Sequence, residues 1–389
     1  MLNFDFYTPT KVFFGKDRQK ELGKIISGYG YKKIMLIYGK GSIKSSGLYD
    51  EITASLGEYN IEFTECGGVE PNPKIEFIRN AVKIAKKENS ELILAVGGGS
   101  AIDAAKYTAL GAVSDCDIWD FVTKSATPKS ALPVGCVLTI AAAGSEMSAS
   151  AVVTDLSLNM KRGFTSELIR PLFAVCNPEL TYTVSPYQTA CGISDIMAHT
   201  MERYFTPCEP VEITDRIAES ILKSVINAAY EVMKDPNNYE ARANIMWASS
   251  LSHNNLTGCG RINSLPVHQL EHAVSGEYDN VAHGAGLAVL FPAWAEFVYM
   301  NNIPRFAQFA RRVWGVDEPD DKTAAEKGIE AMSEFYKFIG MPANLSEFGI
   351  GNDAIDRLTS LCTFNGSRTI KSVVELGDSE IKAIFQKCF

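Results

Sequence analysis

Several marks of a nucleic-acid-binding or disulfide-bonded protein are missing from this sequence of 389 residues. Its formal net charge is −9, and it has no basic stripe of the kind that binding to a phosphate backbone needs. None of the nine cysteines forms a C-x-x-C pair, and their number is odd. In a chain of this size, that pattern indicates reduced, mostly buried thiols.

Long apolar runs are absent as well. The longest, residues 131–143, is shorter than the roughly 20 residues of a membrane-spanning helix. The first residues show no basic-then-apolar signal pattern, and the chain has no internal repeat. Hydrophobic residues make up 46% of the chain, which is ample for large cores. We therefore expect a cytoplasmic protein of about two domains, with no nucleic-acid or membrane partner.

Residues 1–184 alternate short apolar runs with amphipathic stretches. The apolar runs predict buried strands at 34–38, 61–65, 92–96 and 132–138. Helical spacing follows three of them, at 47–56, 75–88 and 101–110. Strands that alternate with crossover helices are typical of a parallel sheet covered on both faces. The sequence therefore predicts an α/β domain over 1–184.

A glycine-rich turn follows the strand predicted at 92–96. Gly97, Gly98, Gly99 and Ser100 lie where that strand ends and a helix begins. Free backbone amides and the helix dipole favour a phosphate there, and glycine lets a pyrophosphate approach the backbone. The turn differs from G-x-G-x-x-G because Ile102 occupies the last position. We interpret it as a phosphate-binding loop; the alternative is a plain tight turn.

The loop after the first predicted strand, residues 39–44, bears on the type of cofactor. In dinucleotide sites an acidic residue near this level holds the ribose 2′-hydroxyl, whereas basic or hydroxyl groups suit a 2′-phosphate. This loop has no acid and offers Lys40, Ser42 and Lys44. The sequence therefore favours NADP over NAD; the alternative is a solvated basic loop.

From about residue 185 the pattern becomes helical to the end of the chain, after a linker at 177–186. Long helical patterns cover 186–204, 211–233, 237–254, 264–275 and 283–301. The sequence thus predicts a second, all-helical domain over 185–389. An α/β domain followed by a helical domain is expected to leave a cleft, which is the usual place for a ligand.

Four of the five histidines and one aspartate suggest a metal site in the helical half. Asp195 and His199 are four residues apart, and so are His268 and His272, so each pair shares one helix face. His283 follows a short turn. Imidazoles with one carboxylate suit Zn²⁺, Fe²⁺ or a similar ion rather than Mg²⁺ or Ca²⁺. Spacing leaves open which histidine is not a ligand, and a purely structural role for each pair remains the alternative.

Taken together, these motifs resemble the iron-containing (group III) alcohol dehydrogenases, in particular the NADPH-dependent butanol dehydrogenase and aldehyde reductase branch. The resemblance covers nearly the whole chain. It rests on residues 38–44, 68–73, 97–103, 139–146, 192–199 and 268–286. It implies a dinucleotide-binding α/β domain, a helical metal-binding domain and a homodimer.

Roles follow from this resemblance by motif position. It implies that the metal ligands are Asp195, His199, His268 and His283. His272 matches a histidine that lies beside the metal and the nicotinamide without being a ligand. The cofactor-binding residues that it implies are Gly39, Ser42, Gly97, Gly98, Gly99, Ser100, Asp103, Thr139 and Lys161.

The implied activity is hydride transfer between NADP(H) and a small alcohol or aldehyde, such as butanol or butanal, with bound Fe²⁺ or Zn²⁺. His272, or a water linked to it, is the candidate proton relay. One rival within the fold is a glycerol-type dehydrogenase or a cyclase resembling dehydroquinate synthase. A metal hydrolase is a rival from another class, although H-E-x-x-H is absent. A non-enzymatic metal or nucleotide sensor is the third.

Overall fold

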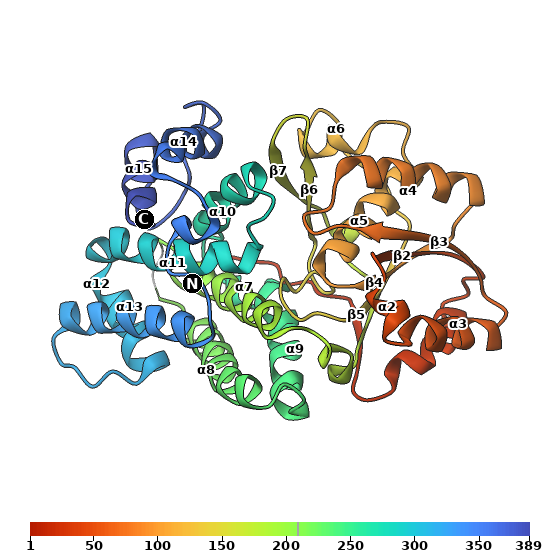
Figure 1. Cartoon of the computed structure of the whole chain (residues 1–389), viewed down its shortest axis with the longest axis horizontal. Coiled ribbons are helices and arrows are strands. Elements are labelled where there is room, and N and C mark those ends of the chain that lie inside the picture. Colours follow the sequence, from red (N-terminus) through yellow and green to blue (C-terminus); the bar gives the residue numbers. More distant parts are fainter. Residues whose placement is uncertain (208–209) are drawn as a thin grey trace. The chain divides into compact units, whose positions relative to one another are not determined.

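The computed structural model describes residues 1–207 and 210–389 (Figure 1). The chain divides into two compact units, Tyr7–Val184, and Ser185–Phe389 together with Met1–Phe6. The first unit is built on a parallel sheet and the second is helical, which confirms the predicted fold class. The cysteines that the structure describes are free thiols and mostly buried, as predicted, and Cys208 lies outside the described residues. No helix among the described residues is both long and apolar enough to cross a membrane.

The unit Tyr7–Val184 is organised around a six-stranded sheet in which every neighbouring pair is parallel. In spatial order the strands are β1 (Lys11–Phe14), β8 (Phe173–Cys176), β5 (Val134–Leu138), β4 (Leu92–Gly97), β2 (Lys33–Gly39) and β3 (Glu62–Val69). The chain places β3 on one side of β2 and β4 on the other. The order therefore reverses between β2 and β4, and in open α/β sheets ligands bind outside the carboxyl ends of the strands at such a reversal.

Helices cover both faces of this sheet, so its central strands are apolar throughout. In Figure 1 the strands lie between α4 and α5 on one side and α2 and α3 on the other. The helices of this unit are α1 (Leu22–Gly28), α2 (Ser42–Ser45), α3 (Leu48–Glu58), α4 (Ile75–Glu88), α5 (Gly99–Ala112) and α6 (Ile118–Val122). Alternate residues of β2, beginning at Ile34, join a core with α1 and α3, as the two-residue period of a strand requires. The predicted strands and helices of this unit are confirmed, with β3 extending beyond its predicted end.

Two strands and a hairpin of this unit were not predicted. The strands are β1 and β8, which complete one side of the sheet. A separate antiparallel hairpin of β6 (Ser150–Asp155) and β7 (Met160–Thr165) packs beside the helices, with β6 against α5 and β7 against α6. The hairpin adds a second small sheet to the predicted parallel one.

The helical unit is built around α7, which is buried from Thr189 to its last residue and packs against α8, α9, α10 and α11. Ser185 caps α7 by accepting a hydrogen bond from the backbone of Gln188, and Pro186 occupies its first turn, as favourable helix starts do. The helices are α7 (Pro186–Tyr204), α8 (Glu212–Lys234), α9 (Tyr239–His253), α10 (Pro266–Glu277), α11 (His283–Val298), α12 (Ile303–Phe309), α13 (Asp321–Phe338), α14 (Ile355–Thr363) and α15 (Asp378–Gln386). The predicted helices of this half are confirmed, and α7 has its predicted bounds.

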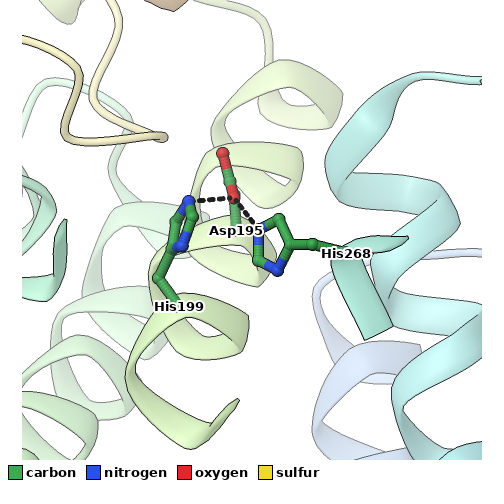
Figure 2. Close-up of side chains that lie close together, drawn as sticks. All are labelled: Asp195, His199 and His268. Carbon is green, nitrogen blue, oxygen red and sulfur yellow. Dashed lines mark hydrogen bonds and ion pairs between the residues drawn. The ribbon is translucent and has the colours of Figure 1, made fainter. Parts of the chain in front are cut away.

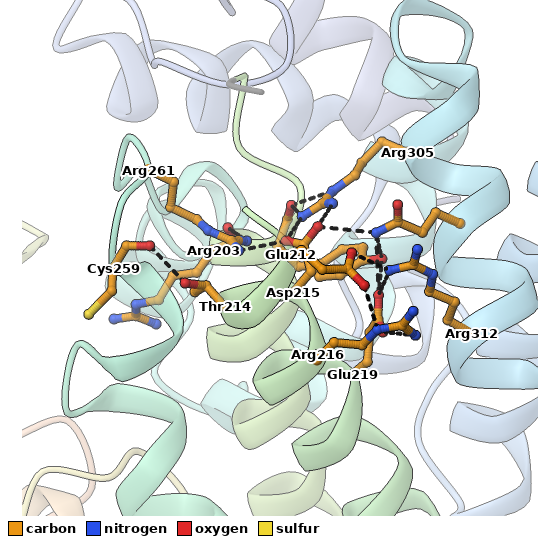
Figure 3. Close-up of polar contacts among 12 residues, drawn as sticks. Arg203, Glu212, Thr214, Asp215, Arg216, Glu219, Cys259, Arg261, Arg305 and Arg312 are labelled. Atoms are coloured by element: carbon orange, nitrogen blue, oxygen red, sulfur yellow. Dashed lines mark hydrogen bonds and ion pairs between the residues drawn. The ribbon is translucent and has the colours of Figure 1, made fainter. Parts of the chain in front are cut away.

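A buried cluster of ionic side chains anchors the end of α7 (Figure 3). The last carbonyls of a helix lack partners within it. Here Arg261 donates to the carbonyl of Arg203 at 2.9 Å, and Arg305 donates to that of Tyr204 at 2.7 and 2.8 Å. Both guanidinium groups are held by the fully buried carboxylate of Asp215 on α8. Breaking such a buried pair costs about 3–5 kcal/mol, so the cluster fixes where α7 ends.

Candidate metal centre and cofactor loop

Three side chains of the helical unit converge on one point (Figure 2). Asp195 and His199 lie one turn apart on α7, and His268 lies on the first turn of α10. The Oδ1 atom of Asp195 is 3.3 Å from Nε2 of His199 and 3.4 Å from Nε2 of His268. All three residues are buried, and their potential ligand atoms lie within 4.8 Å of one another. The predicted pairing of the two histidine-bearing segments is therefore present in space.

His283, the first residue of α11, approaches the same carboxylate. Its Nε2 atom is 3.9 Å from Oδ1 of Asp195. The neighbouring Gly284 explains how α11 comes so near α7, because a Cβ atom there would lie 2.0 Å from the carbonyl oxygen of Cys191. Only glycine fits at that distance. The three histidines predicted as ligands are thus gathered around Asp195, the fourth.

Two carboxylates stand behind the histidines. The Nδ1 atom of His268 is hydrogen-bonded to Glu202, and the Nδ1 atom of His283 is hydrogen-bonded to Glu271. An ionised carboxylate can only accept, so the Nδ1 atom of each ring carries a proton that it donates to its glutamate, and Nε2 is the ring atom that faces Asp195. Carboxylates of this kind orient metal-binding histidines and raise their basicity.

Glu202 has a second task. Its Oε1 atom accepts hydrogen bonds from the backbone amides of Val267 and His268, at 2.5 and 3.1 Å. Those amides belong to the first turn of α10, where helix N–H groups have no partner within the helix. One side chain of α7 therefore holds both the start of α10 and the ring of His268.

The electrostatics of the site follow from burial and from these acids. Burial lowers the pKa of His199 well below its usual value, and the neighbouring ring of His253, 3.9 Å away between centroids, lowers it further. Burial alone would lower the pKa of His268 too, but Glu202 and Asp195 raise it to about 9. A cation that binds His268 must displace the second ring proton, so metal uptake releases a proton.

The arrangement fits a divalent transition metal. A tetrahedral ion with bonds of about 2.1 Å places its ligand atoms roughly 3.4 Å apart, close to the distances around Asp195. Three imidazoles with one carboxylate suit Zn²⁺ or Fe²⁺, whereas Mg²⁺ and Ca²⁺ prefer oxygen ligands. The Nδ1 atom of His199 has no hydrogen-bond partner among the residues that the structure describes.

A substitution of Glu202 tests its orienting role. In Glu202→Gln the side chain keeps its volume and one acceptor oxygen, but the amide cannot replace both carboxylate contacts. We expect the dissociation constant for Zn²⁺ or Fe²⁺ to rise about 10–100-fold, as with other outer partners of metal-binding histidines. Competition with a fluorescent chelator measures it. Thr200→Val is the matched control, because Thr200 is equally buried on α7 but donates to Ile196 in its own helix. Unchanged metal affinity in Glu202→Gln would contradict the assigned role.

His272 lies beside this centre. Its ring centroid is 5.7 Å from that of His283 and 6.4 Å from that of His268. With Glu271 and His283 it forms a second group of potential ligand atoms within 4.8 Å of one another. Because Glu271 is hydrogen-bonded to the Nδ1 atom of His283, we interpret Glu271 as a carboxylate that orients this ligand of the first site. We do not interpret the second group as a separate metal site. His272 is left less buried than His268, as a proton relay requires.

The predicted cofactor residues lie in the unit Tyr7–Val184, most of them at the carboxyl edge of its sheet. Gly39 ends β2, Gly97 ends β4, and Thr139 follows β5 and donates from its backbone to Gly97. The remaining ones at this edge are Ser42 at the start of α2, Gly98 as the N-cap of α5, and Gly99 and Ser100 in its first turn. The strand–turn–helix setting predicted for the glycine turn is present, and it flanks the reversal between β2 and β4.

Two other predicted cofactor residues are more enclosed. Asp103, on α5, is buried, and its carboxylate accepts hydrogen bonds from the Ser145 hydroxyl at 2.6 Å and from the backbone of Val152 at 2.8 Å. Burial raises the pKa of Asp103. Lys161, on β7, is also buried and lies near enough to Asp103 to act against that rise.

Sequence reasoning missed the two supporting carboxylates. Glu202 follows His199 by three residues, and Glu271 follows His268 by three. Residues three apart share a helix face, so an acid at this offset from each candidate ligand was the available signal. The sequence could not show that each acid supports a histidine: Glu202 crosses to α10, and Glu271 crosses to α11.

The chain matches known proteins over nearly its whole length. A family model described as iron-containing alcohol dehydrogenase matches residues 9–178, and one described as Fe-containing alcohol dehydrogenase family, C-terminal, matches residues 189–389. The chain is 40% identical to NADH-dependent butanol dehydrogenase A of Clostridium acetobutylicum over the full length of both. It is 36% identical to NADPH-dependent aldehyde reductase YqhD of Escherichia coli, over 92% of each. The crystal structure of NADH-dependent butanol dehydrogenase A from Thermotoga maritima superposes with a TM-score of 0.96 at 35% identity, covering 100% of this chain and 99% of that one.

Proposed function

Since the chain belongs to the iron-containing alcohol dehydrogenase family and is an alcohol/aldehyde oxidoreductase that uses a nicotinamide cofactor and a metal, we propose that it interconverts butanal-like aldehydes and their alcohols with NADP(H). In this proposal residues 1–184 form the cofactor domain and residues 185–389 the metal domain. The observation that carries it is the convergence of three histidines predicted as ligands on Asp195, with a further carboxylate hydrogen-bonded to each of two of them.

Each residue has a separate task in the proposed reaction. Asp195, His199, His268 and His283 hold the cation, and Glu202 and Glu271 fix the orientation of two of the imidazoles. A divalent cation bound there supplies Lewis acidity toward the substrate oxygen, and the nicotinamide supplies or accepts the hydride. In the reducing direction, His272 delivers a proton from its ring to the oxygen that becomes the alcohol, directly or through a water. The backbone amides at the Gly97–Ser100 turn bind the cofactor pyrophosphate.

The choice of NADP(H) rests on the loop after β2. Between Gly39 and Lys44 there is no acid to accept from a ribose 2′-hydroxyl, while Lys40 and Lys44 offer positive charge. Lys40 is paired with Glu70 at 2.8 Å and Lys44 with Glu65 at 3.1 Å. Both pairs are largely exposed, and exposed ion pairs add little to stability, so a phosphate can replace the acids as the partner of each lysine. The name of the Escherichia coli relative supports NADPH, whereas the names of the butanol dehydrogenases specify NADH.

We also propose that the protein is a homodimer with bound Fe²⁺ or Zn²⁺. Four large apolar side chains at the start of the chain are exposed: Met1, Leu2, Phe4 and Phe6. Strand β1 lies at one end of the sheet and is only partly buried. An exposed apolar segment next to an edge strand suits contact with a second copy.

Turnover with butanal tests the proposal. Protein purified without oxygen should consume NADPH on addition of butanal, with a larger kcat/KM for NADPH than for NADH. A chelator should abolish the activity, and Fe²⁺ or Zn²⁺ should restore it. Elemental analysis of the same preparation identifies the ion.

The alternative functions give different results. Turnover that a chelator leaves intact would remove the metal from the mechanism. Cofactor binding without turnover across a panel of aldehydes would support a nucleotide sensor. A preference for NADH would overturn the interpretation of the Gly39–Lys44 loop while leaving the activity in place.

A further inference from the structure

A buried lysine on the cofactor unit is not used by the mechanism. Lys106 lies on α5, and its side chain has no exposed surface. Its Nζ atom donates to the Ser145 hydroxyl at 2.8 Å and to the carbonyls of Ser148 and Ser150 at 3.0 and 2.7 Å. Burying an ammonium group is costly unless its hydrogen bonds and charge are matched. Here all the acceptors come from one segment, residues 145–150.

Asp103, one turn earlier on α5, completes the arrangement. The Ser145 hydroxyl accepts from Lys106 and donates to Asp103, while the second oxygen of Asp103 accepts from Val152 at the start of the hairpin. The aspartate also supplies the opposite charge that the buried ammonium needs. Two side chains of α5 therefore clamp residues 145–152.

The residues just before the clamped segment lie against the glycine turn. A Cβ atom on Gly98 would lie 3.2 Å from Cβ of Ile140, and one on Gly99 would lie 3.4 Å from Cβ of Ala143. The loop just before the clamp therefore lies so close to the turn that it would be met by a side chain at either glycine. Helix α5 thus carries the glycine turn at its first residues and, through Asp103 and Lys106, holds the loop that lies against that turn.

From these contacts we propose that Asp103 and Lys106 are positioning residues for the cofactor site, which keep residues 139–144 against the Gly97–Ser100 turn so that the pyrophosphate meets a preformed pocket. This inference rests on the proposed function in that it takes the glycine turn as the cofactor loop. It gives Asp103 an indirect role, since both of its carboxylate oxygens are bonded within the unit.

Two variants and one control test the inference. Lys106→Met keeps the length of the side chain and removes the ammonium, and Ser145→Ala removes the hydroxyl that joins Lys106 to Asp103. Thr108→Val is the control, because Thr108 is fully buried on the same helix but donates to Ala104 within it. Binding is measured directly as the change in NADPH fluorescence, and kcat and both KM values are measured with butanal.

The expected result is a split between binding and turnover. In Lys106→Met and Ser145→Ala the dissociation constant and KM for NADPH rise at least about tenfold, because displacement of a binding wall by even about 1 Å weakens alignment strongly. The KM for butanal, the metal content and kcat at saturating NADPH stay near wild type, and Thr108→Val changes none of them. If the two residues had a purely structural role, the variants would yield less folded protein, and the folded fraction would bind NADPH as the wild type does. If Lys106→Met does not fold, Ser145→Ala decides alone.

Other outcomes overturn the inference. Folded variants that bind NADPH as wild type does would remove the positioning role while leaving the proposed function intact, and so would a loss of kcat with unchanged KM for NADPH. A wild-type protein that binds neither NADPH nor NADH would overturn the proposed function and this inference together.

Discussion

Asp195→Asn should leave the protein folded and without its metal. The Asp195 carboxylate is the point on which three imidazoles converge, and it supplies the negative charge that the cation needs among neutral ligands. A bound divalent cation contributes several kcal/mol to the transition state. At about 1.4 kcal/mol for each factor of ten, activity with butanal should fall at least about 10³-fold. Elemental analysis of the purified variant should find little Fe or Zn.

The neighbouring serine supplies the control. Ser194 is fully buried on α7, and its hydroxyl donates to Ala190 in the same helix, so Ser194→Ala perturbs α7 without touching the proposed ligands. It should keep both metal and activity. Wild-type metal content in Asp195→Asn would mean that the ion sits elsewhere, for instance in the group of Glu271, His272 and His283.

His272→Ala should separate metal binding from turnover. His272 lies near His283 but outside the group around Asp195, so its removal leaves the four ligands in place. A positioned general acid or base contributes typically 10²–10⁴-fold, so kcat for butanal reduction should fall by about 10²-fold or more. The metal content, measured on the same sample, should stay near the wild-type value.

His272→Asn gives the matched comparison, because asparagine can hydrogen-bond to water but cannot carry a proton in the working pH range. It should be as slow as the alanine variant. Loss of metal in either variant would make His272 a ligand. Full turnover in the asparagine variant would replace proton transfer by a purely hydrogen-bonding role.

The parts of the fold that the sequence predicted are those with a long or continuous pattern. Strand β4 is a fully buried apolar run, and α7 begins with a serine cap and a proline, so its start was evident. Strands β1 and β8 have four residues each. Such segments are too short for periodicity to separate them from loops, and the partner that makes them strands is distant in the chain. The β6–β7 hairpin was missed because its strands carry mixed polar and apolar residues, as in Met160–Thr165.

The site was predictable as a set of residues but not as a geometry. The four-residue spacing of Asp195 and His199 placed them on one helix face, and the structure confirms that they face each other. Spacing alone did not separate His272 from the other histidines; the resemblance to a family did. Nor could it show that the lysines after β2 pair with Glu65 on β3 and Glu70 just after it, because those acids are more than twenty residues away. Such facts depend on which strands become neighbours.

The buried ionic cluster at the end of α7 has a consequence for how the site acquires its metal ion. Arg261, Arg305 and Asp215 hold the helix end, and Glu202 holds the start of α10, through bonds between protein groups in which no metal ion takes part. In small zinc domains, by contrast, folding and metal capture are one event. Here the helices that carry the proposed ligands are held in place by other contacts, so we expect metal binding to follow folding as a separate step. We therefore expect a chelator to remove the ion without unfolding the helical unit, so that the supply of ions, as well as ligand preference, selects which ion is bound.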